Sequence, residues 1–180
     1  MRARLAKGFT LVELLVVIAI IGLLAGIVIA SLNGSRKKGR DARRVADIRA
    51  IQLAVESYFQ VCNQFPPNIH NTSINTGCSG TNLGTYLPAI PVDPLGVAYS
   101  YSTYASPGAL FTCTGYHLGA ALEDTTNKAL TDDSDKAPGG TGCSNSDGDF
   151  DGTSANAGSC SSTAGTPQPG GTERCYDLQG

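Results

Sequence analysis

The longest apolar stretch of the chain runs from Leu14 to Ser31, and basic residues lie on both sides of it. No charged residue occurs between Leu14 and Asn33, and about 20 apolar residues are enough for a helix to cross a bilayer core. Glu13 stands at the start of the stretch. A carboxylate so close to hydrocarbon is costly unless it is paired, so it is a functional candidate. The pattern predicts a membrane-spanning helix that begins with a functional acid.

A second helical pattern follows the basic cluster behind this stretch. Apolar residues recur there at spacings of three and four: Val45, Ile48, Ile51, Val55, Tyr58 and Cys62. Such a stripe predicts an amphipathic helix that packs on a core. Pro66 and Pro67 end it, because proline donates no backbone hydrogen bond and restricts the residue before it. Either one helix runs from about Phe9 to about Gln60, or two helices meet at the linker Asn33-Gly34-Ser35.

Beyond the prolines the pattern changes to short strands. One alternation comprises Val97, Tyr99, Tyr101 and Thr103, and another comprises Tyr116, Leu118, Ala120 and Leu122. With residues 109–113 between them, we predict three strands separated by turns at Ser106-Pro107-Gly108 and Thr114-Gly115. The expected fold is α+β: a long N-terminal helix, half transmembrane and half amphipathic, packed on a small antiparallel sheet. A loop-rich C-terminal tail tied by disulfides completes it.

Charge divides the chain into a basic beginning and an acidic remainder. Residues 1–49 hold ten of the 13 Lys and Arg but three of the 15 acids. The span is followed directly by a basic cluster: Arg36, Lys37, Lys38, Arg40, Arg43 and Arg44. By the positive-inside rule this cluster favours a cytoplasmic location for the part of the chain after the span, whereas Arg2, Arg4 and Lys7 weakly favour the opposite topology.

Six cysteines all lie after the span: Cys62, Cys78, Cys113, Cys143, Cys160 and Cys175. An even number outside the span is typical of disulfides in an oxidising, extracytoplasmic compartment, and the pairing stays open. Zinc is disfavoured, because there is no Cys-x-x-Cys pair and His70 and His117 have no ligand spacing. The cysteines therefore favour a head outside the cytoplasm.

Gly8-Phe9-Thr10-Leu11-Val12-Glu13 before a long apolar stretch resembles the class III signal of type IV pilins and type II secretion pseudopilins. The resemblance implies that a prepilin peptidase cuts after Gly8 on the cytoplasmic side and methylates Phe9. It implies that Glu13 pairs with the N-terminal amine of a neighbouring subunit during assembly. It also favours one continuous helix. The expected partners are identical or related pilin subunits, an inner-membrane assembly platform, and membrane lipid before assembly.

The stretch Asp93-Pro94-Leu95-Gly96-Val97-Ala98-Tyr99-Ser100-Tyr101 is similar to the Asp-Pro-Trp-Gly-x-Pro-Tyr-x-Tyr stretch of the major pseudopilin. Leu95 replaces the usual tryptophan and Ala98 the usual proline, and six cysteines are atypical of that subunit. The similarity covers residues 8 to about 122. It implies a cleaved leader (1–8), a transmembrane and assembly helix (9–33) and a head (34–180). The head would comprise an amphipathic helix (34–65), a variable loop (66–96), the sheet (97–122) and a Gly/Ser/Asp-rich tail (123–180).

Two simpler interpretations compete with the pilin-like one. A conventional signal peptide could be cut between Ala30 and Ser31, and an unprocessed chain could serve as a single-span anchor. Neither gives a reason for Glu13 or for the Gly8-Phe9 pair.

The tail contains two candidate calcium clusters. Asp147, Asp149 and Asp151 alternate ahead of Gly152, as carboxylates do in calcium loops, although Gly158 stands where such a loop carries its last acid. The competing cluster is Asp132, Asp133 and Asp135, nearer the place where major pseudopilins bind calcium. A solvated acidic loop is the alternative to both.

No catalytic constellation occurs, so we do not expect an enzyme, and the acidic head makes nucleic acid an unexpected partner. Two functions remain. The chain is either a structural subunit of a type II secretion pseudopilus or type IV pilus, or a minor pilin or tethered adhesin whose tail binds a surface ligand. Either would be a single-pass inner-membrane protein with an extracytoplasmic head, found later in a periplasmic or surface filament.

Overall fold

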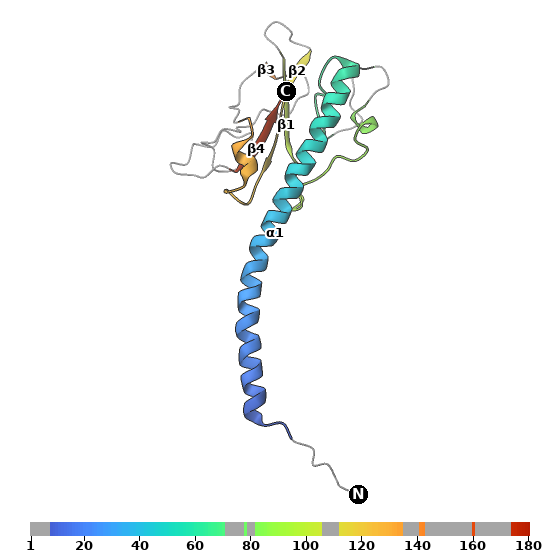
Figure 1. Ribbon diagram of the computed structural model, residues 1–180. Coiled ribbons are helices and arrows are strands. Elements are labelled where there is room, and N and C mark those ends of the chain that lie inside the picture. The colour runs from blue at the N-terminus through green and yellow to red at the C-terminus, as the bar shows by residue number, and fades with distance from the viewer. Residues whose placement is uncertain are drawn as a thin grey trace. The chain divides into compact units, whose positions relative to one another are not determined.

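The computed structural model describes residues 8–70, 78, 82–105, 112–134, 141–142, 160 and 174–180. The chain divides into two compact units, Met1–Lys38 and Gly39–Gly180. We call residues 8–38 the N-terminal segment and residues 39–180 the head. One helix, α1, runs from Leu11 to Cys62 and contributes to both units (Figure 1). The prediction of one continuous helix is therefore confirmed.

Both ends of α1 have clear local causes. Thr10 caps the beginning, where its hydroxyl oxygen accepts the Glu13 N–H at 3.2 Å and its own N–H donates to the Glu13 carboxylate at 2.9 Å. This is a capping box, in which two helix-terminal groups satisfy each other. At the other end Asn63 has a φ of 52°, a left-handed conformation that stops a helix. The helix thus ends at Cys62, slightly before the prolines that the sequence indicated.

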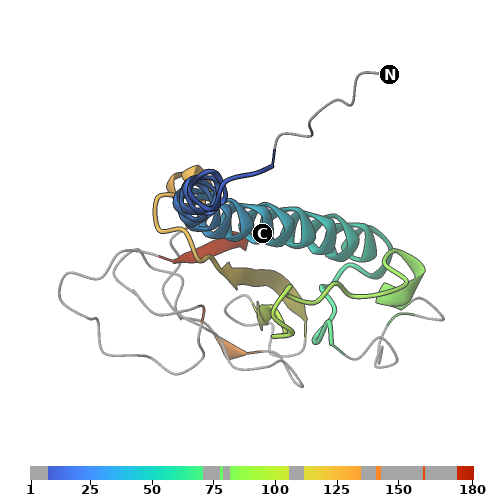
Figure 2. The same cartoon turned by 90° about the horizontal axis from the view of Figure 1, so that it is seen from below.

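The head is built on a four-stranded antiparallel sheet with strand order β3-β1-β2-β4. The strands are β1 (Ser100–Ala105), β2 (Cys113–Ala121), β3 (Thr141–Gly142) and β4 (Cys175–Gln179). Two short 3-10 helices, η1 (Leu83–Thr85) and η2 (Lys128–Thr131), lie in the connections. The part of α1 that belongs to the head lies along one face of the sheet (Figure 2).

The apolar stripe of the amphipathic helix forms one side of the core. Ile48, Ile51, Val55 and Tyr58 are buried, and Val45 and Cys62 pack against them. β1, β2 and the residues that flank them contribute the buried alternating residues that the sequence indicated: Tyr99, Tyr101, Thr103, Tyr116, Leu118, Ala120 and Leu122. Val97 is the exception, because it lies between the turn at 94–96 and β1 and is 65% exposed.

The prediction of separate strands on either side of Thr114-Gly115 was wrong, because β2 runs unbroken through both residues. Gly115 pairs with Tyr104 across the sheet, and a Cβ atom at Gly115 would come within 2.3 Å of the Tyr104 ring. The glycine therefore makes room for a neighbouring aromatic side chain and does not form a turn. The turn predicted at Ser106-Pro107-Gly108 lies outside the described residues.

The tail, which was predicted to be loop-rich, ends in a strand. β4 pairs antiparallel with β2, and Tyr176 and Leu178 add buried side chains to the core. Gly180 extends this pairing, since its carbonyl accepts the Tyr116 N–H at 2.9 Å. The C-terminal residues are thus part of the sheet.

Two disulfides fasten the described residues of the head. Cys62–Cys78 ties the end of α1 to the following loop, and Cys160–Cys175 ties the tail to the start of β4. Cys113 is also disulfide-bonded, and Cys143 lies outside the described residues. The prediction of disulfide-bonded cysteines is confirmed for the five described ones.

Candidate functional site

The predicted processing site lies just before the capped start of α1. Gly8 and Phe9 precede the helix, and both are exposed. A Cβ atom at Gly8 would meet no other atom within 4 Å. The peptide bond between the two residues is therefore sterically open in the folded chain, as a protease substrate must be.

Glu13 is hydrogen-bonded to Thr10, and no positive charge pairs with it among the described residues. Both hydrogen bonds from Thr10, through its N–H at 2.9 Å and its hydroxyl at 2.7 Å, go to the same carboxylate oxygen, Oε2. Among residues 8–35 there is no Lys, Arg or His that could neutralise the charge. The capping box orients the carboxylate but leaves it without a counter-ion within the described N-terminal segment.

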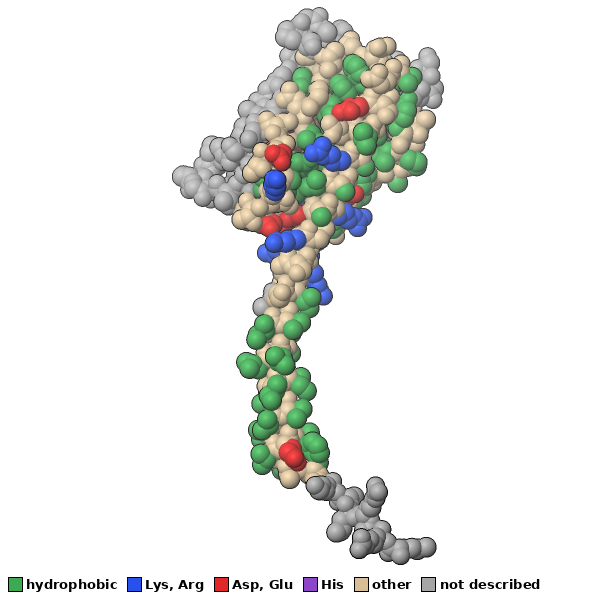
Figure 3. Space-filling model, in the orientation of Figure 1, with side chains coloured by type: hydrophobic (Ala, Val, Ile, Leu, Met, Phe, Trp, Pro, Cys, Tyr) green, Lys and Arg blue, Asp and Glu red, His purple; other side chains and the backbone are tan. Residues whose placement is uncertain are grey.

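The apolar part of the N-terminal segment has no partner within the described chain. Its large apolar side chains, from Phe9 to Leu32, are between 46% and 78% exposed. Within the described residues, this is the one helix long and apolar enough to cross a membrane. Figure 3 shows these apolar side chains with no Lys or Arg among them on the visible face. Exposed apolar surface of this extent marks an interaction with a membrane or with other proteins.

The candidate calcium residues are only partly described. Asp147, Asp149 and Asp151 lie outside the described residues, as does Asp135. Asp132 and Asp133 directly follow η2. Within the described part of the chain, no group of three or more His, Cys, Asp or Glu side chains is placed to hold a metal ion. Asp132 and Asp133 therefore do not complete a site with other described residues.

An ion-pair network in the head escaped the sequence reasoning. The side chain of Arg44 is 3% exposed and donates to Asp41 at 2.6 Å, to Glu123 at 2.8 Å and to Asp93. Arg40 donates to the second oxygen of Glu123 at 2.6 Å. The i,i+3 spacing of Asp41 and Arg44 was a usable signal. Asp93 and Glu123 are 49 and 79 residues from Arg44, and no local pattern connects them to it.

Asp41 extends this network to the backbone. Its carboxylate is fully buried and accepts the N–H groups of Glu123 and Asp124 at 2.9 Å and 2.8 Å. The helix side chains thereby hold the segment that follows β2, while Arg44 also holds the turn that contains Asp93. Buried charges of this kind are tolerated only when they are paired and hydrogen-bonded.

The network shifts the pKa values of Glu123, Asp93 and Arg44. Hydrogen bonds from Arg40 lower the pKa of Glu123 to about 2, against the opposing effect of burial, and Arg44 adds to the lowering. Burial alone would raise the pKa of Asp93, but hydrogen bonds from Arg44 and from the Leu95 N–H lower it overall. The hydrogen bond to Asp93 raises the pKa of Arg44. Glu123 and Asp93 therefore stay ionised further into the acidic range than free carboxylates do.

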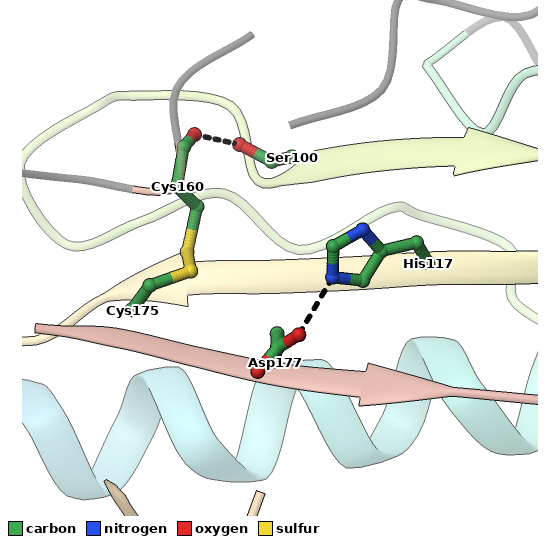
Figure 4. The surroundings of a disulfide bond; sticks show 5 residues. All are labelled: Ser100, His117, Cys160, Cys175 and Asp177. Carbon is green, nitrogen blue, oxygen red and sulfur yellow. Dashed lines mark hydrogen bonds and ion pairs between the residues drawn. A yellow bond between two sulfur atoms is a disulfide. The ribbon is translucent and has the colours of Figure 1, made fainter. Parts of the chain in front are cut away.

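A second polar pair lies on the sheet face that points away from α1. His117 Nε2 lies 2.6 Å from Asp177 Oδ2, and both side chains are fully buried. The pair joins β2 to β4 close to the Cys160–Cys175 disulfide, beside which the Ser100 hydroxyl donates to the Cys160 carbonyl (Figure 4). Burial removes the pair from any substrate, so we assign it to fastening the last strand.

Three features together define a pilin-like protein. The predicted processing site is exposed, the exposed apolar part of α1 begins with an acid, and the rest of α1 packs on an antiparallel sheet in the head. The family described as "Prokaryotic N-terminal methylation motif" matches residues 3–29. This match covers Gly8, Phe9 and Glu13 together with most of the apolar stretch. It agrees with the class III signal identified in the sequence.

Similar proteins identify the family within the pilin-like class to which the chain belongs. It is 31% identical over 125 residues to the type II secretion system core protein G of Vibrio cholerae serotype O1, with 66% of this chain and 84% of that protein covered. It is 31% identical over 134 residues to the protein of the same name from Aeromonas hydrophila, with 71% and 92% covered. It is 30% identical over 127 residues to the protein of the same name from Pseudomonas aeruginosa, with 67% of this chain and 87% of that protein covered. No solved structure matches the chain. The chain belongs to the family of type II secretion system core protein G, the major pseudopilin.

Proposed function

We propose that this protein is the main structural subunit of a type II secretion pseudopilus. Prepilin peptidase cuts it after Gly8 and methylates Phe9, and residues 9–33 anchor it in the inner membrane with the head outside the cytoplasm. An inner-membrane assembly platform then brings the subunits together through their N-terminal helices. The similarity to the core protein G relatives supports the secretion pseudopilus over a type IV pilus, and a structural subunit over a tethered adhesin.

The observation that carries this proposal is Glu13 on an exposed apolar helix. The carboxylate is held by Thr10 yet lacks a counter-ion among the described residues of its segment, and the surrounding apolar side chains are exposed. Cleavage after Gly8 creates an amine at Phe9. A charge in low dielectric is stabilised only by a close opposite charge. In a filament, the Phe9 amine of a neighbouring subunit supplies that charge while helices of other subunits cover the apolar surface.

The test is Glu13→Ala with Leu14→Ala as its matched control. Leu14 is the adjacent exposed residue, so its variant shortens a side chain at nearly the same place but keeps the carboxylate. We expect both variants to lose the leader and Leu14→Ala to form filaments. Glu13→Ala should be processed but absent from sheared filaments. Normal filaments from processed Glu13→Ala would contradict the proposed pairing of Glu13 with the Phe9 amine of a neighbouring subunit.

A bound calcium ion is a separate proposal, supported by the donor chemistry of the tail. Carboxylate oxygens are the ligands that Ca²⁺ prefers. If the ion binds, millimolar calcium should raise the melting temperature of the head. Replacing the three acids of one cluster by Asn should abolish the rise, and the same change in the other cluster should leave it intact. The clusters are Asp147, Asp149 and Asp151, and Asp132, Asp133 and Asp135. If calcium left the melting temperature of the wild type unchanged, both clusters would be interpreted as solvated acidic loops that bind no calcium.

A further inference from the structure

The structure divides the basic cluster behind the apolar stretch into two groups. Arg40, Arg43 and Arg44 each form an ion pair with an acid of the head, the Arg43 pair to Asp47 being 3.8 Å long. Arg36, Lys37 and Lys38 are exposed, and within the described residues they make no hydrogen bond or ion pair. Three of the six positive charges are therefore paired with acids of the head, and the other three are unpaired among the described residues.

The three remaining residues lie at a definite depth relative to the apolar stretch. Leu32, which directly follows the stretch, is the last large exposed apolar residue before the basic cluster, and the residues from Leu32 to Lys38 belong to α1. With a rise of 1.5 Å per residue, Arg36 and Lys38 lie about 6 and 9 Å beyond Leu32 along the helix axis. The headgroup layer is roughly 5 to 7 Å thick on each side of the hydrocarbon core. The long side chains can reach back along the helix into that layer.

Their angular distribution favours lipid over a single protein surface. Consecutive helix residues are about 100° apart, so the three side chains cover about 200° of the helix circumference. A partner protein would meet one side of the helix, whereas lipid surrounds it. Gly34, two residues before Arg36, has open space where a side chain would stand, which leaves room for headgroups.

We propose that Arg36, Lys37 and Lys38 form a binding surface for anionic phospholipid headgroups in the leaflet next to the head. The guanidinium group of Arg36 binds phosphate through paired hydrogen bonds, and the two ammonium groups bind as point charges. The surface fixes the depth of the helix in the bilayer before assembly. The inference rests on the proposed function only in requiring that residues 9–33 span a membrane.

The experiment uses the full chain reconstituted in nanodiscs of phosphatidylcholine with or without phosphatidylglycerol. The chain is extracted in mild detergent, and the lipids that remain bound are quantified by mass spectrometry. The test variant is Arg36→Gln/Lys37→Gln/Lys38→Gln. The matched control is Arg43→Gln, which removes one exposed positive charge of the same helix that is already paired in the head. The leader residues Arg2, Arg4 and Lys7 stay constant in every sample.

We expect wild type and Arg43→Gln to retain phosphatidylglycerol in preference to phosphatidylcholine. The preference should fall about fivefold for each basic side chain removed and should weaken as salt is added. A charge-conserving variant, Arg36→Lys/Lys37→Arg/Lys38→Arg, should keep it.

Equal retention of the two lipids by the inserted wild type would overturn this inference and leave the proposed function standing. A preference that survives the triple substitution would also overturn it. A chain that enters neither kind of nanodisc would contradict the membrane anchor of the proposed function itself.

Discussion

The helix α1 is exposed in the N-terminal segment and packed against the sheet in the head. Residues 8–38 bury no large apolar side chain and leave Glu13 without a counter-ion in that described segment. In the head, α1 buries its apolar stripe against the sheet, and Arg44 alone reaches three acids. One half of the helix is completed by its own chain, and the other half requires other molecules.

This difference in contacts indicates which residues act on stability and which act on function. Polar and apolar groups of the head are satisfied internally, so substitutions there should act mainly on stability. In the N-terminal segment they should act on processing, membrane binding and assembly, because the folded chain makes few contacts through it. Substitutions in each half of the helix can test this division.

The largest effect should come from Gly8→Leu, which places a bulky side chain beside the peptide bond that we propose is cut. We expect complete retention of the leader, measured by the mass of the chain from membranes. Gly8→Ala is the control, since alanine is small enough to be tolerated. A side chain at Gly8 meets nothing in the fold, so a block would not reflect misfolding. Normal maturation of the leucine variant would contradict the assigned site.

Arg44→Ala should be the most damaging single change to the head. It leaves Asp41 and Asp93 as buried acids without their cation, and breaking a buried pair in this way costs about 3 to 5 kcal/mol. Arg43→Ala is the matched control, because its exposed pair should contribute about 1 kcal/mol or less. Urea denaturation of residues 39–180 measures both. Equal losses would show that the network does not stabilise the head as described.

Removing one disulfide should lower the free energy of unfolding by somewhat less than Arg44→Ala does. Cys160→Ser/Cys175→Ser opens a loop with a sequence separation of 15, and Cys62→Ser/Cys78→Ser one of 16. Loops of this size predict losses of about 2 to 4 kcal/mol each, nearly equal for the two bridges. Urea denaturation would show this directly. If neither variant lost stability, the two bridges would not contribute to the stability of the head.

The smallest effect should be a loss of folding stability at acidic pH that is due to Glu123. Its pKa is lowered from 4.5 to about 2 by folding, so its stabilising contribution is present above pH 4.5 and is lost as the pH falls toward 2. Glu123→Gln should therefore reduce the slope of stability against pH in that window. The same slope in variant and wild type would assign the acid sensitivity to other carboxylates.

The sequence predicted elements that depend on local pattern and missed those that depend on distant partners. The stripe from Val45 to Cys62 and the alternation from Tyr116 to Leu122 were sufficient, because periodicity reports burial directly. β4 was missed although Tyr176 and Leu178 alternate, since five residues behind a Gly- and Ser-rich tail give a weak signal.

The candidate sites divide in the same way. Gly8, Phe9 and Glu13 are close together in sequence, and the match to residues 3–29 agrees with the prediction made from them. Arg44 with Asp93 and Glu123, and Cys160 with Cys175, meet only when the chain folds. Neither the long-range ion pairs of Arg44 nor the disulfide pairing could therefore be derived from spacing.

The most direct test of the central claim is the mass and N-terminal sequence of the chain recovered from membranes and sheared filaments. The account predicts a chain that begins with a methylated Phe9 in both fractions. A start at Ser31 would identify an ordinary secreted protein, and an intact Met1 an unprocessed anchor. Either result would contradict assembly through the N-terminal segment.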